Sequence, residues 1–397
     1  MYQKLAFFGN SPAFEKPKST SNLIKPDMDK FLSYIKPYYD NEDLAEDNLL
    51  IQKLENRLAT IHGSKYCIAV CNGLWGLVLA INELKIKNKT EIIMPSLTYR
   101  RMADIAAWLK MIPHFCDVEI KTFGISPRSV ENCINDNTAL ILAPHPIVNL
   151  CDIEGLLNVA KKHNLPILFD SVEASYACFK GKPIGSFGDA EVFSVHASKF
   201  LNGFEGGYIT TNNLDLAKRI KAARNFGINH NQNVITLGIN GKMISPHAAM
   251  TMACLDLLDN QIEKNKERFY RYKELLKKVK GIDLVEYNLV ERRSFKNILV
   301  KLNNFWPYNR EETLVFLQKE NMVVRPYYYP PLHKKKAIYP TIIGEIKNAE
   351  LLMNDFMLLP CGEFVSLEDI ETIVEYLIYL ENNFISIKEA IDIFNNA

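Results

Sequence analysis

Three absences limit the classes of protein that this 397-residue sequence can encode. The sequence has almost no excess of charge of one sign, because 47 lysines and arginines are balanced by 46 acidic residues, for a formal net charge of +1. Without an overall basic field, we expect no binding to nucleic acid or to an anionic membrane surface. Long apolar runs are lacking too, since stretches such as TALILAPHPIVNL are too short and too interrupted by proline to span a bilayer. The N-terminal segment MYQKLAFFGNSPAFEKPKS has no apolar core typical of a signal peptide, so we interpret it as an arm.

Paired cysteines are the third absence. The eight cysteines are scattered along the chain, with no CxxC pair and no accompanying HExxH motif. This spacing argues against the common zinc sites, and we expect no bound metal. Most of the cysteines lie inside apolar stretches, which favours buried free thiols and therefore a reducing compartment. The cytoplasm is the expected location.

Short apolar runs alternate with helical patterns from about residue 49 to residue 284. YCIAV, EIIMP, TALILAP, LPILFD and AEVFSV are typical of strands, whereas LWGLVLAINEL and IEGLLNVAKKH have helical periodicity. This alternation predicts an α/β domain around a mostly parallel sheet. A long helical stretch over 245–278 then leads to two expected strands, KNILVKL and MVVRPYYY, and two expected helices, IKNAELLMNDFM and LEDIETIVEYLIYLEN. We therefore divide the chain into an N-terminal arm (1–48), a large α/β domain (49–255) and a smaller C-terminal α+β domain (256–397).

Two side chains that could take part in catalysis lie at or after the ends of these runs. This position is informative because ligands of parallel sheets bind beyond the carboxyl ends of the strands. Lys199 lies between Ser194 and a glycine-rich turn that would let the backbone approach a ligand. As a Schiff-base former, Lys199 would need a lowered pKa, because only the neutral amine attacks an aldehyde. The alternative is a solvated surface lysine. Asp170 ends LPILFD, where it would either meet a cation such as a protonated pyridine nitrogen or cap the next helix.

An anion cradle is expected where YCIAV passes through Asn72 and Gly73 into a helix. Backbone amides at a helix N-terminus are free to bind a phosphate, and the Ser194 hydroxyl would add a further donor. Tyr99, in MPSLTYRR beyond another strand, offers an aromatic face that can stack on a planar ring. Each feature taken alone is more often structural than functional. They converge on one site only if the strands are parallel.

Taken together, these segments resemble the DegT/DnrJ/EryC1/StrS family of sugar aminotransferases, which use pyridoxal phosphate (PLP). MPSLTYRRMADIAAWLKMIPHFCDV is similar to the family's Pro-Ser-x-Thr-aromatic segment, and YYPPLH is similar to its C-terminal Tyr-x-Pro-Leu-His region. LFDSVEASYACFKGKPIGSFGDAEVFSVHASKFLNGFEGGYITT is similar to the family's run of aspartate, phosphate-binding serine, lysine and Gly-Glu-Gly-Gly. The resemblance implies PLP-dependent fold type I, which is aspartate-aminotransferase-like. Its large domain has a mixed, mostly parallel sheet, and its smaller C-terminal domain is α+β.

The resemblance also implies roles for single residues. Lys199 would hold the cofactor as an internal aldimine and would later move the proton between substrate and cofactor. Asp170 would pair with the pyridine nitrogen, Glu173 would lie near the phenolic oxygen or the substrate, and Tyr99 would stack on the ring. The implied phosphate ligands are Ser194, the amides of Gly73 and Leu74, and Asn240 of a neighbouring subunit. The active unit would therefore be a homodimer with shared sites.

Some positions depart from the family pattern. The phosphate turn is Asn-Gly-Leu where the family has Ser-Gly-Thr, so one hydroxyl contact is lost. Lys242 stands where the family has arginine, and it keeps the charge without the bidentate fork. Arg100 and Arg101 replace small or apolar residues, and they would either meet an anionic substrate or begin a basic surface helix. We expect these departures to leave the chemistry of PLP intact and to leave the identity of the substrate open.

The expected activity is amino transfer from an amino acid, glutamate by resemblance, to a keto sugar linked to a nucleotide. A cyclitol or a non-sugar ketone remains open as the acceptor. A dehydratase of the same family is another alternative, but such members resemble this fold with histidine in place of the lysine, so Lys199 disfavours it. A non-catalytic PLP-binding paralogue is a further alternative, which bleaching of a yellow protein by an amino donor would exclude.

Overall fold

The computed structural model describes residues 5–19, 24–40, 49–229, 231–288 and 291–395. An eight-stranded sheet, in the order β15-β4-β3-β5-β6-β9-β10-β2, forms the centre of the larger unit. β10 (Gly207–Thr211) is antiparallel to both of its neighbours, β9 (Ala190–Ser194) and β2 (Tyr66–Val70). All other neighbouring pairs of this sheet are parallel. The sheet is mixed and mostly parallel, which confirms the predicted fold class.

The remaining central strands of this sheet include three of the predicted apolar runs, EIIMP, TALILAP and LPILFD. They are β3 (Glu91–Pro95), β4 (Ile112–Cys116), β5 (Thr138–Pro144) and β6 (Ile167–Asp170), with the short β15 (Ile342–Ile343) at the edge. Every residue of β3, β5 and β6 is buried. Strands covered on both faces need apolar side chains pointing both ways, which is why these segments are continuous apolar runs.

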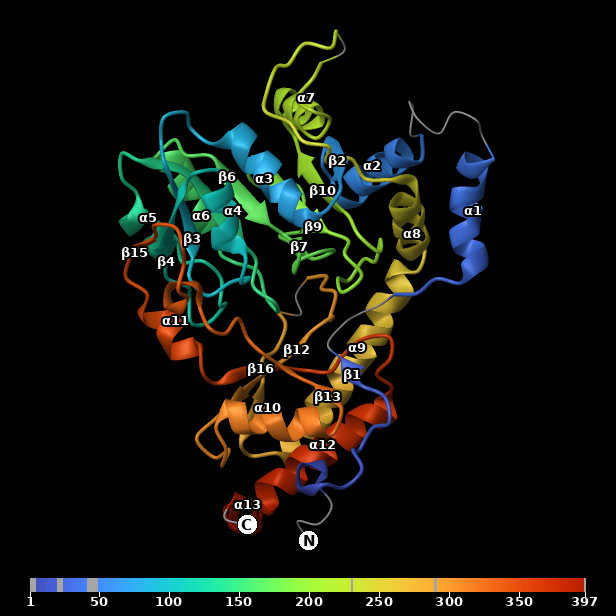
Figure 1. Cartoon of the computed structure of the whole chain (residues 1–397), viewed down its shortest axis with the longest axis vertical. Helices are drawn as coiled ribbons and strands as arrows, with labels where there is room; N and C mark the ends of the chain where they lie inside the picture. Colours follow the sequence, from blue (N-terminus) through green and yellow to red (C-terminus); the bar gives the residue numbers. More distant parts are fainter. Residues whose placement is uncertain (1–4, 20–23, 41–48, 230, 289–290, 396–397) are drawn as a thin grey trace.

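Helices cover both faces of the large sheet (Figure 1). Apolar side chains on one face pack against α3 (Gly73–Leu84), α4 (Met102–Trp108) and α7 (Leu214–Ala223). Those on the other face pack against α2 (Leu49–His62), α5 (Pro127–Cys133), α6 (Ile153–Lys162) and α8 (Ser245–Leu255). The small hairpin of β7 (Cys178–Phe179) and β8 (Lys182–Pro183) lies outside this sheet. The larger unit is therefore a three-layer α/β structure.

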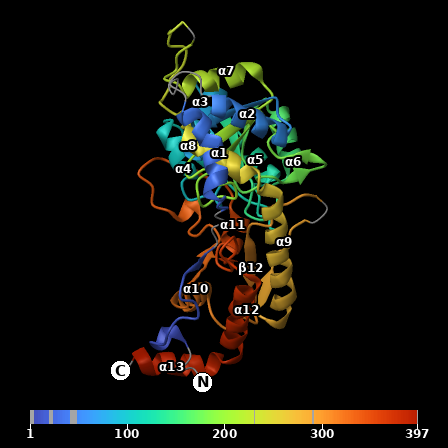
Figure 2. The ribbon, with the colours of Figure 1, turned by 90° about the vertical axis from the view of Figure 1, so that its right-hand side faces the viewer.

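A second, antiparallel sheet forms the smaller unit. Its strands, in spatial order, are β11 (Ile282–Leu284), β12 (Ile298–Leu302), β16 (Phe356–Leu359) and β14 (Arg325–Pro326). The helices of this unit are α9 (Leu258–Leu275), η3 (Leu276–Lys278), α10 (Arg310–Lys319), η4 (Leu332–Lys334), α11 (Lys347–Leu352), α12 (Leu367–Asn382) and α13 (Phe384–Asn395). Figure 2 shows α9 and α12 side by side along this unit. The predicted α+β character of the C-terminal part is confirmed.

One predicted helix was partly wrong. IKNAELLMNDFM, predicted as a single helix over 346–357, contains α11, which ends at Leu352, and the beginning of β16 at Phe356. The four residues of β16 are all buried between β12 and β14. A short apolar run does not distinguish a buried strand from the end of an amphipathic helix, and here the pairing with two neighbouring strands decides.

The N-terminal segment contacts both units. η2 (Ala6–Phe8) and β1 (Lys18–Ser19) lie against the smaller unit, where β1 pairs in parallel with β13 (Met322–Val323). α1 (Met28–Tyr39) packs against α8 of the larger unit. Residues 1–4, 20–23 and 41–48 of the predicted arm lie outside the described residues. In the described part of the chain, no helix has the length and apolar character that a membrane span requires.

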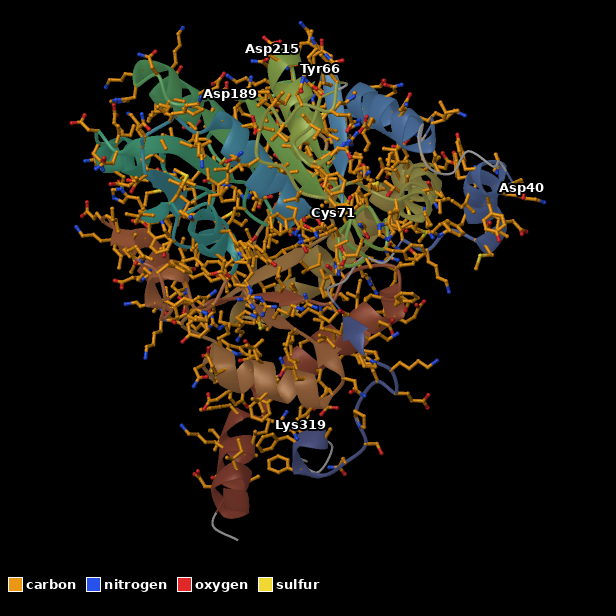
Figure 3. All side chains as sticks on the ribbon, turned by 45° about the horizontal axis from the view of Figure 1, so that its top comes forward. Asp40, Tyr66, Cys71, Asp189, Asp215 and Lys319 are labelled. Atoms are coloured by element: carbon orange, nitrogen blue, oxygen red, sulfur yellow. The ribbon has the colours of Figure 1, made fainter. Side chains whose placement is uncertain are left out.

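The carboxyl ends of the parallel strands point toward the smaller unit. In Figure 3, Cys71, which follows the carboxyl end of β2, lies on the side that faces the second sheet. Tyr66 at the beginning of β2, together with Asp189 and Asp215, lies at the opposite side. Residues that follow β2, β3, β6 and β9 therefore share one edge, and this edge faces the second sheet.

Candidate active site

The turn between β2 and α3 presents backbone amides at this edge. Asn72 caps the helix, because its side-chain oxygen accepts from the amide of Trp75 at 2.9 Å and its carbonyl accepts from the amide of Gly76 at 3.0 Å. Within the described residues, no hydrogen bond uses the amides of Gly73 and Leu74. They point from the positive end of a twelve-residue helix, which is the arrangement that binds a phosphate.

Close packing at this turn explains its glycines. A Cβ at Gly73 would lie 2.9 Å from the Cβ of Ser194, and a Cβ at Gly207 would lie 2.6 Å from the amide nitrogen of Gly73. Ser194 ends β9 and pairs with Gly207 in the ladder, so its side chain lies beside the free amides. Its Oγ accepts from the amide of His196 at 3.3 Å. The structure therefore brings the predicted phosphate ligands Gly73, Leu74 and Ser194 together.

Asp170 is a buried carboxylate at the end of β6. Its side chain accepts from the amide of Val172 at 3.2 Å, and it forms no ion pair with any of the residues that the structure describes. The residue is 8% exposed. Burial raises the pKa of Asp170 to about 6, although the Val172 amide and the charge of Lys199 act in the opposite direction. A carboxylate in this state is stabilised by a cation, and a protonated pyridine nitrogen is such a cation.

Lys199 lies close to two acidic residues, Asp170 at the end of β6 and Glu173 just after it. Its Nζ is 2.9 Å from Oε1 of Glu173, and its side chain is 25% exposed. Burial alone would lower the pKa of Lys199, but the carboxylates of Glu173 and Asp170 outweigh burial and raise it. The expectation of a lowered pKa at Lys199 was therefore wrong for the protein without a bound aldehyde. The sequence alone did not show how close Glu173 comes.

A second lysine, which the sequence did not indicate as a site residue, completes this cluster. Nζ of Lys296 lies 2.8 Å from Oε2 of Glu173, and the Lys296 side chain is only 5% exposed. Nδ2 of Asn297 also approaches Oε2, at 3.4 Å. Burial would raise the pKa of Glu173, but the ammonium groups of Lys199 and Lys296 hold it well below its usual range. The only sequence signal was a lysine two residues before the apolar run of β12.

Two tyrosines border the cluster. Tyr99, beyond β3, is 42% exposed and lies close enough to Lys199 to influence its pKa. Tyr328 comes from the smaller unit, and burial together with the nearby carboxylates of Glu173 and Asp170 raises its pKa. Tyr99 therefore lies near Lys199, and its stacking on a cofactor ring stays a prediction.

The loop that carries Tyr328 is fixed to the large sheet. The amide of Leu332 donates to the carbonyl of Ser96 at 2.8 Å, and the Ser96 hydroxyl lies 2.5 Å from Nδ1 of His333. Ser96 directly follows β3 and is fully buried. The YYPPLH segment thus closes the site from the second unit.

Arg100 and Arg101 are exposed at the beginning of α4. Arg101 pairs with Asp104 of its own helix at 3.3 Å, an ion pair that is common at the beginning of a surface helix. Nζ of Lys335 donates to the Arg100 carbonyl at 3.0 Å, so a third basic side chain lies beside them. The structure places this basic group next to Tyr99.

Asn240 is exposed. Among the described residues, no hydrogen bond joins it to the cluster of its own chain. The carbonyl of its neighbour, Gly241, accepts from the amide of Cys71 at 2.7 Å, so this segment lies beside the turn before α3. Nζ of Lys242 lies 5.6 Å from the centre of the Phe226 ring, in a cation–π contact.

The three parts of the site fit PLP. The amides of α3 and Ser194 suit its phosphate, Asp170 suits its ring nitrogen, and Lys199 suits its aldehyde. Among the described residues, no group of three histidine, cysteine, aspartate or glutamate side chains is placed to hold a metal ion.

Comparison with known proteins agrees with this arrangement. A "dTDP-4-amino-4,6-dideoxy-D-glucose transaminase" of Shigella dysenteriae is 28% identical over 364 residues, which cover 91% of this chain and 98% of that protein. A "dTDP-3-amino-3,6-dideoxy-alpha-D-galactopyranose transaminase" of Aneurinibacillus thermoaerophilus is 30% identical and covers 82% of this chain and 88% of its own. The crystal structure of DesI with its TDP-sugar product superposes with a TM-score of 0.92 at 27% identity, over 99% of this chain and 100% of DesI.

The family profile leads to the same result. The DegT/DnrJ/EryC1/StrS aminotransferase family matches residues 29–378, which include both sheets and every residue of the cluster. Together with the site geometry, this match shows that the chain belongs to the DegT/DnrJ/EryC1/StrS aminotransferase family.

Proposed function

We propose that this protein is a PLP-dependent aminotransferase that moves an amino group from an amino acid, glutamate, to a keto sugar carried on a nucleotide. Relatives that align over most of the chain are transaminases of dTDP-linked amino sugars, which supports the substrate class. One observation carries the proposal. Lys199, the carboxylate of Asp170, which has no ion-pair partner among the described residues, and the free amides of α3 lie along one sheet edge.

PLP supplies an aldehyde that bonds amines and a ring that draws electrons from the substrate carbon. Asp170 would hold a proton on the ring nitrogen, because an ionised carboxylate in this buried position favours a cation beside it. Glu173 orients Nζ of Lys199 through the 2.9 Å contact. The amine of Lys199 would take the proton from the α-carbon of the donor and later return a proton to the acceptor carbon. The free amides of α3 would hold the phosphate.

The two half-reactions test the proposal separately. Glutamate added to the yellow protein should bleach it and release 2-oxoglutarate in an amount equal to the bound cofactor. The bleached protein is then offered 3-keto and 4-keto dTDP-hexoses, the same sugars without nucleotide, and keto cyclitols. Return of the yellow colour with a nucleotide-linked sugar supports the proposal, and return only with a cyclitol supports the alternative acceptor. Release of ammonia without an aminated product would instead indicate the dehydratase, and a protein that no donor bleaches would contradict transamination.

We further propose that the active unit is a homodimer. The segment after α7 exposes apolar side chains, including Val234, Ile235 and Leu237, of which Leu237 is 80% exposed. Exposed apolar side chains that lie close together in a chain favour a protein–protein contact, and the exposed Asn240 belongs to the same segment. We assign this segment to the contact with a second copy, where Asn240 of that copy would reach the cofactor phosphate. Sedimentation of the wild type and of Leu237→Asp tests the assignment, because a monomeric wild type would overturn it.

The same proposal places the enzyme in the cytoplasm. All eight cysteines are free thiols, and six of them are buried. Free buried thiols persist best in a reducing compartment. Fractionation of cells that express the full chain tests this, since recovery of the protein outside the cytoplasm would contradict it.

A further inference from the structure

Glu173 receives two ammonium groups, one on each carboxylate oxygen. Lys199 approaches Oε1 at 2.9 Å, and Lys296 approaches Oε2 at 2.8 Å. The two lysines come from different units, since Lys199 follows β9 of the large sheet and Lys296 precedes β12 of the second sheet. The proposed reaction uses Lys199 and leaves Lys296 without a role.

The Lys296 ammonium is held rigidly. Its side chain is 5% exposed, and the next residue, Asn297, is fixed by bonds to Tyr287 and to the carbonyl of Ile147. A buried charge of this kind is costly unless it is paired, and Glu173 supplies the pairing. The pair Glu173–Lys296 is therefore nearly neutral as a unit beside Lys199.

Lys199 must lose a proton before its amine can bond an aldehyde or remove a proton from a donor carbon. If Glu173 paired with Lys199 alone, its carboxylate would strongly oppose this loss of a proton, because an opposite charge within about 4 to 6 Å favours the charged form of an amine. We propose that Lys296 is a positioning residue that occupies half of the Glu173 carboxylate and, by its positive charge, eases release of the proton from Lys199.

Other titratable groups also face this cluster. Those that interact with Lys199 or Glu173 are Asp170 at the end of β6, Tyr99 after β3, and Tyr287, Tyr327 and Tyr328 of the smaller unit. Asp170 and Tyr99 raise the pKa of Lys199. The two ammonium groups on Glu173 repel each other, and the charge of Lys199 contributes to lowering the pKa of Lys296. Among these groups Lys296 is the one that brings a second positive charge to the carboxylate that pairs with Lys199.

The inference rests on the proposed role of Lys199, and its test avoids cofactor and substrate altogether. Apo-protein is labelled with trace isotopic acetic anhydride over a range of pH, and the rate at Lys199 is read by mass spectrometry of peptides. The exposed Lys121 in the same sample is the internal reference. The midpoint of the rate profile reports when the Lys199 amine becomes neutral. This readout stays valid even if amino transfer is not the activity.

Lys296→Met should raise this midpoint by about 1 unit or more, which slows labelling near neutral pH about tenfold. Lys296→Arg keeps the charge and should leave the midpoint near that of the wild type, whereas Glu173→Gln should lower it. An unchanged or lowered midpoint in Lys296→Met overturns the proposal. Removal of Lys296 leaves Glu173 buried without this partner, which can prevent folding. The double variant Glu173→Gln/Lys296→Gln is therefore also compared with Glu173→Gln. If the labelling midpoint of Lys199 is not higher in the double variant, the proposal is overturned as well.

Discussion

Replacement of Asp170 by asparagine removes one charge from the buried end of β6 and changes little else. The amide is of the same size, and its oxygen can still accept from the amide of Val172. What is lost is the anion that would hold the ring nitrogen of the cofactor in its protonated form. We expect Asp170→Asn to bind PLP and to lose most of its turnover.

The magnitude follows from the burial of Asp170. Burial raises its pKa from 3.8 to about 6, a change of about 2 units, which corresponds to about 3 kcal/mol. A cation in contact offsets this cost, and two opposite charges about 4 Å apart attract by about 4 kcal/mol at an effective dielectric constant of about 20. Loss of about 3 to 4 kcal/mol from the transition state lowers the rate about 10²- to 10³-fold.

The assay is the single-turnover release of 2-oxoglutarate from glutamate at saturating PLP, with cofactor occupancy read by absorbance. Asp215→Asn is the matched control, because it makes the same change of charge at an exposed position on the opposite edge of the sheet (Figure 3). The control should react like the wild type. A rate for Asp170→Asn within about tenfold of the wild type, at normal occupancy and melting temperature, would refute the role given to Asp170.

Three further predictions concern other parts of the molecule. Gly73→Ala places a Cβ 2.9 Å from the Cβ of Ser194, so it should weaken PLP binding about tenfold or more in a fluorescence titration, and unchanged affinity would remove the cradle from the account. Burial raises the pKa of Glu191 to about 7, so the folded state binds this proton more tightly than the unfolded state and stability falls as pH rises through about 7. Glu191→Gln should therefore gain up to about 3 kcal/mol relative to the wild type between about pH 5 and pH 8 in urea unfolding of apo-protein, and equal pH profiles would disprove this. Mixed dimers of Lys199→Ala and Asn240→Ala subunits should form more keto acid than either parent dimer, because one site regains both residues; no gain would mean that Asn240 serves its own chain.

The large sheet and the Lys199–Asp170 pair could be predicted because their signals are local. Buried parallel strands are apolar on both faces, and β5 is recognisable from its seven residues alone. Asp170 ends one such strand and Lys199 follows another, so the rule for the carboxyl ends of strands brings them to one edge. No knowledge of the second unit was needed.

Lys296 could not be predicted, because its function depends on how the two units pack. It precedes β12, and only the docking of that sheet against the carboxyl edge brings its Nζ to 2.8 Å from Glu173. The direction of the Lys199 pKa shift was misjudged for a similar reason, because the sequence does not show that Glu173 lies 2.9 Å from the Lys199 amine. The end of α11 was missed for a related reason, since β16 is defined by pairing with β12 and β14 rather than by its own pattern.

The central claim concerns which amine bonds the cofactor, because two lysines, Lys199 and the buried Lys296, lie against the same carboxylate. Reduction of the PLP-saturated protein with borohydride, followed by peptide mass spectrometry, fixes the bond to one of them. The account predicts a single pyridoxyl adduct on Lys199. An adduct on Lys296, or none in saturated protein, would contradict it.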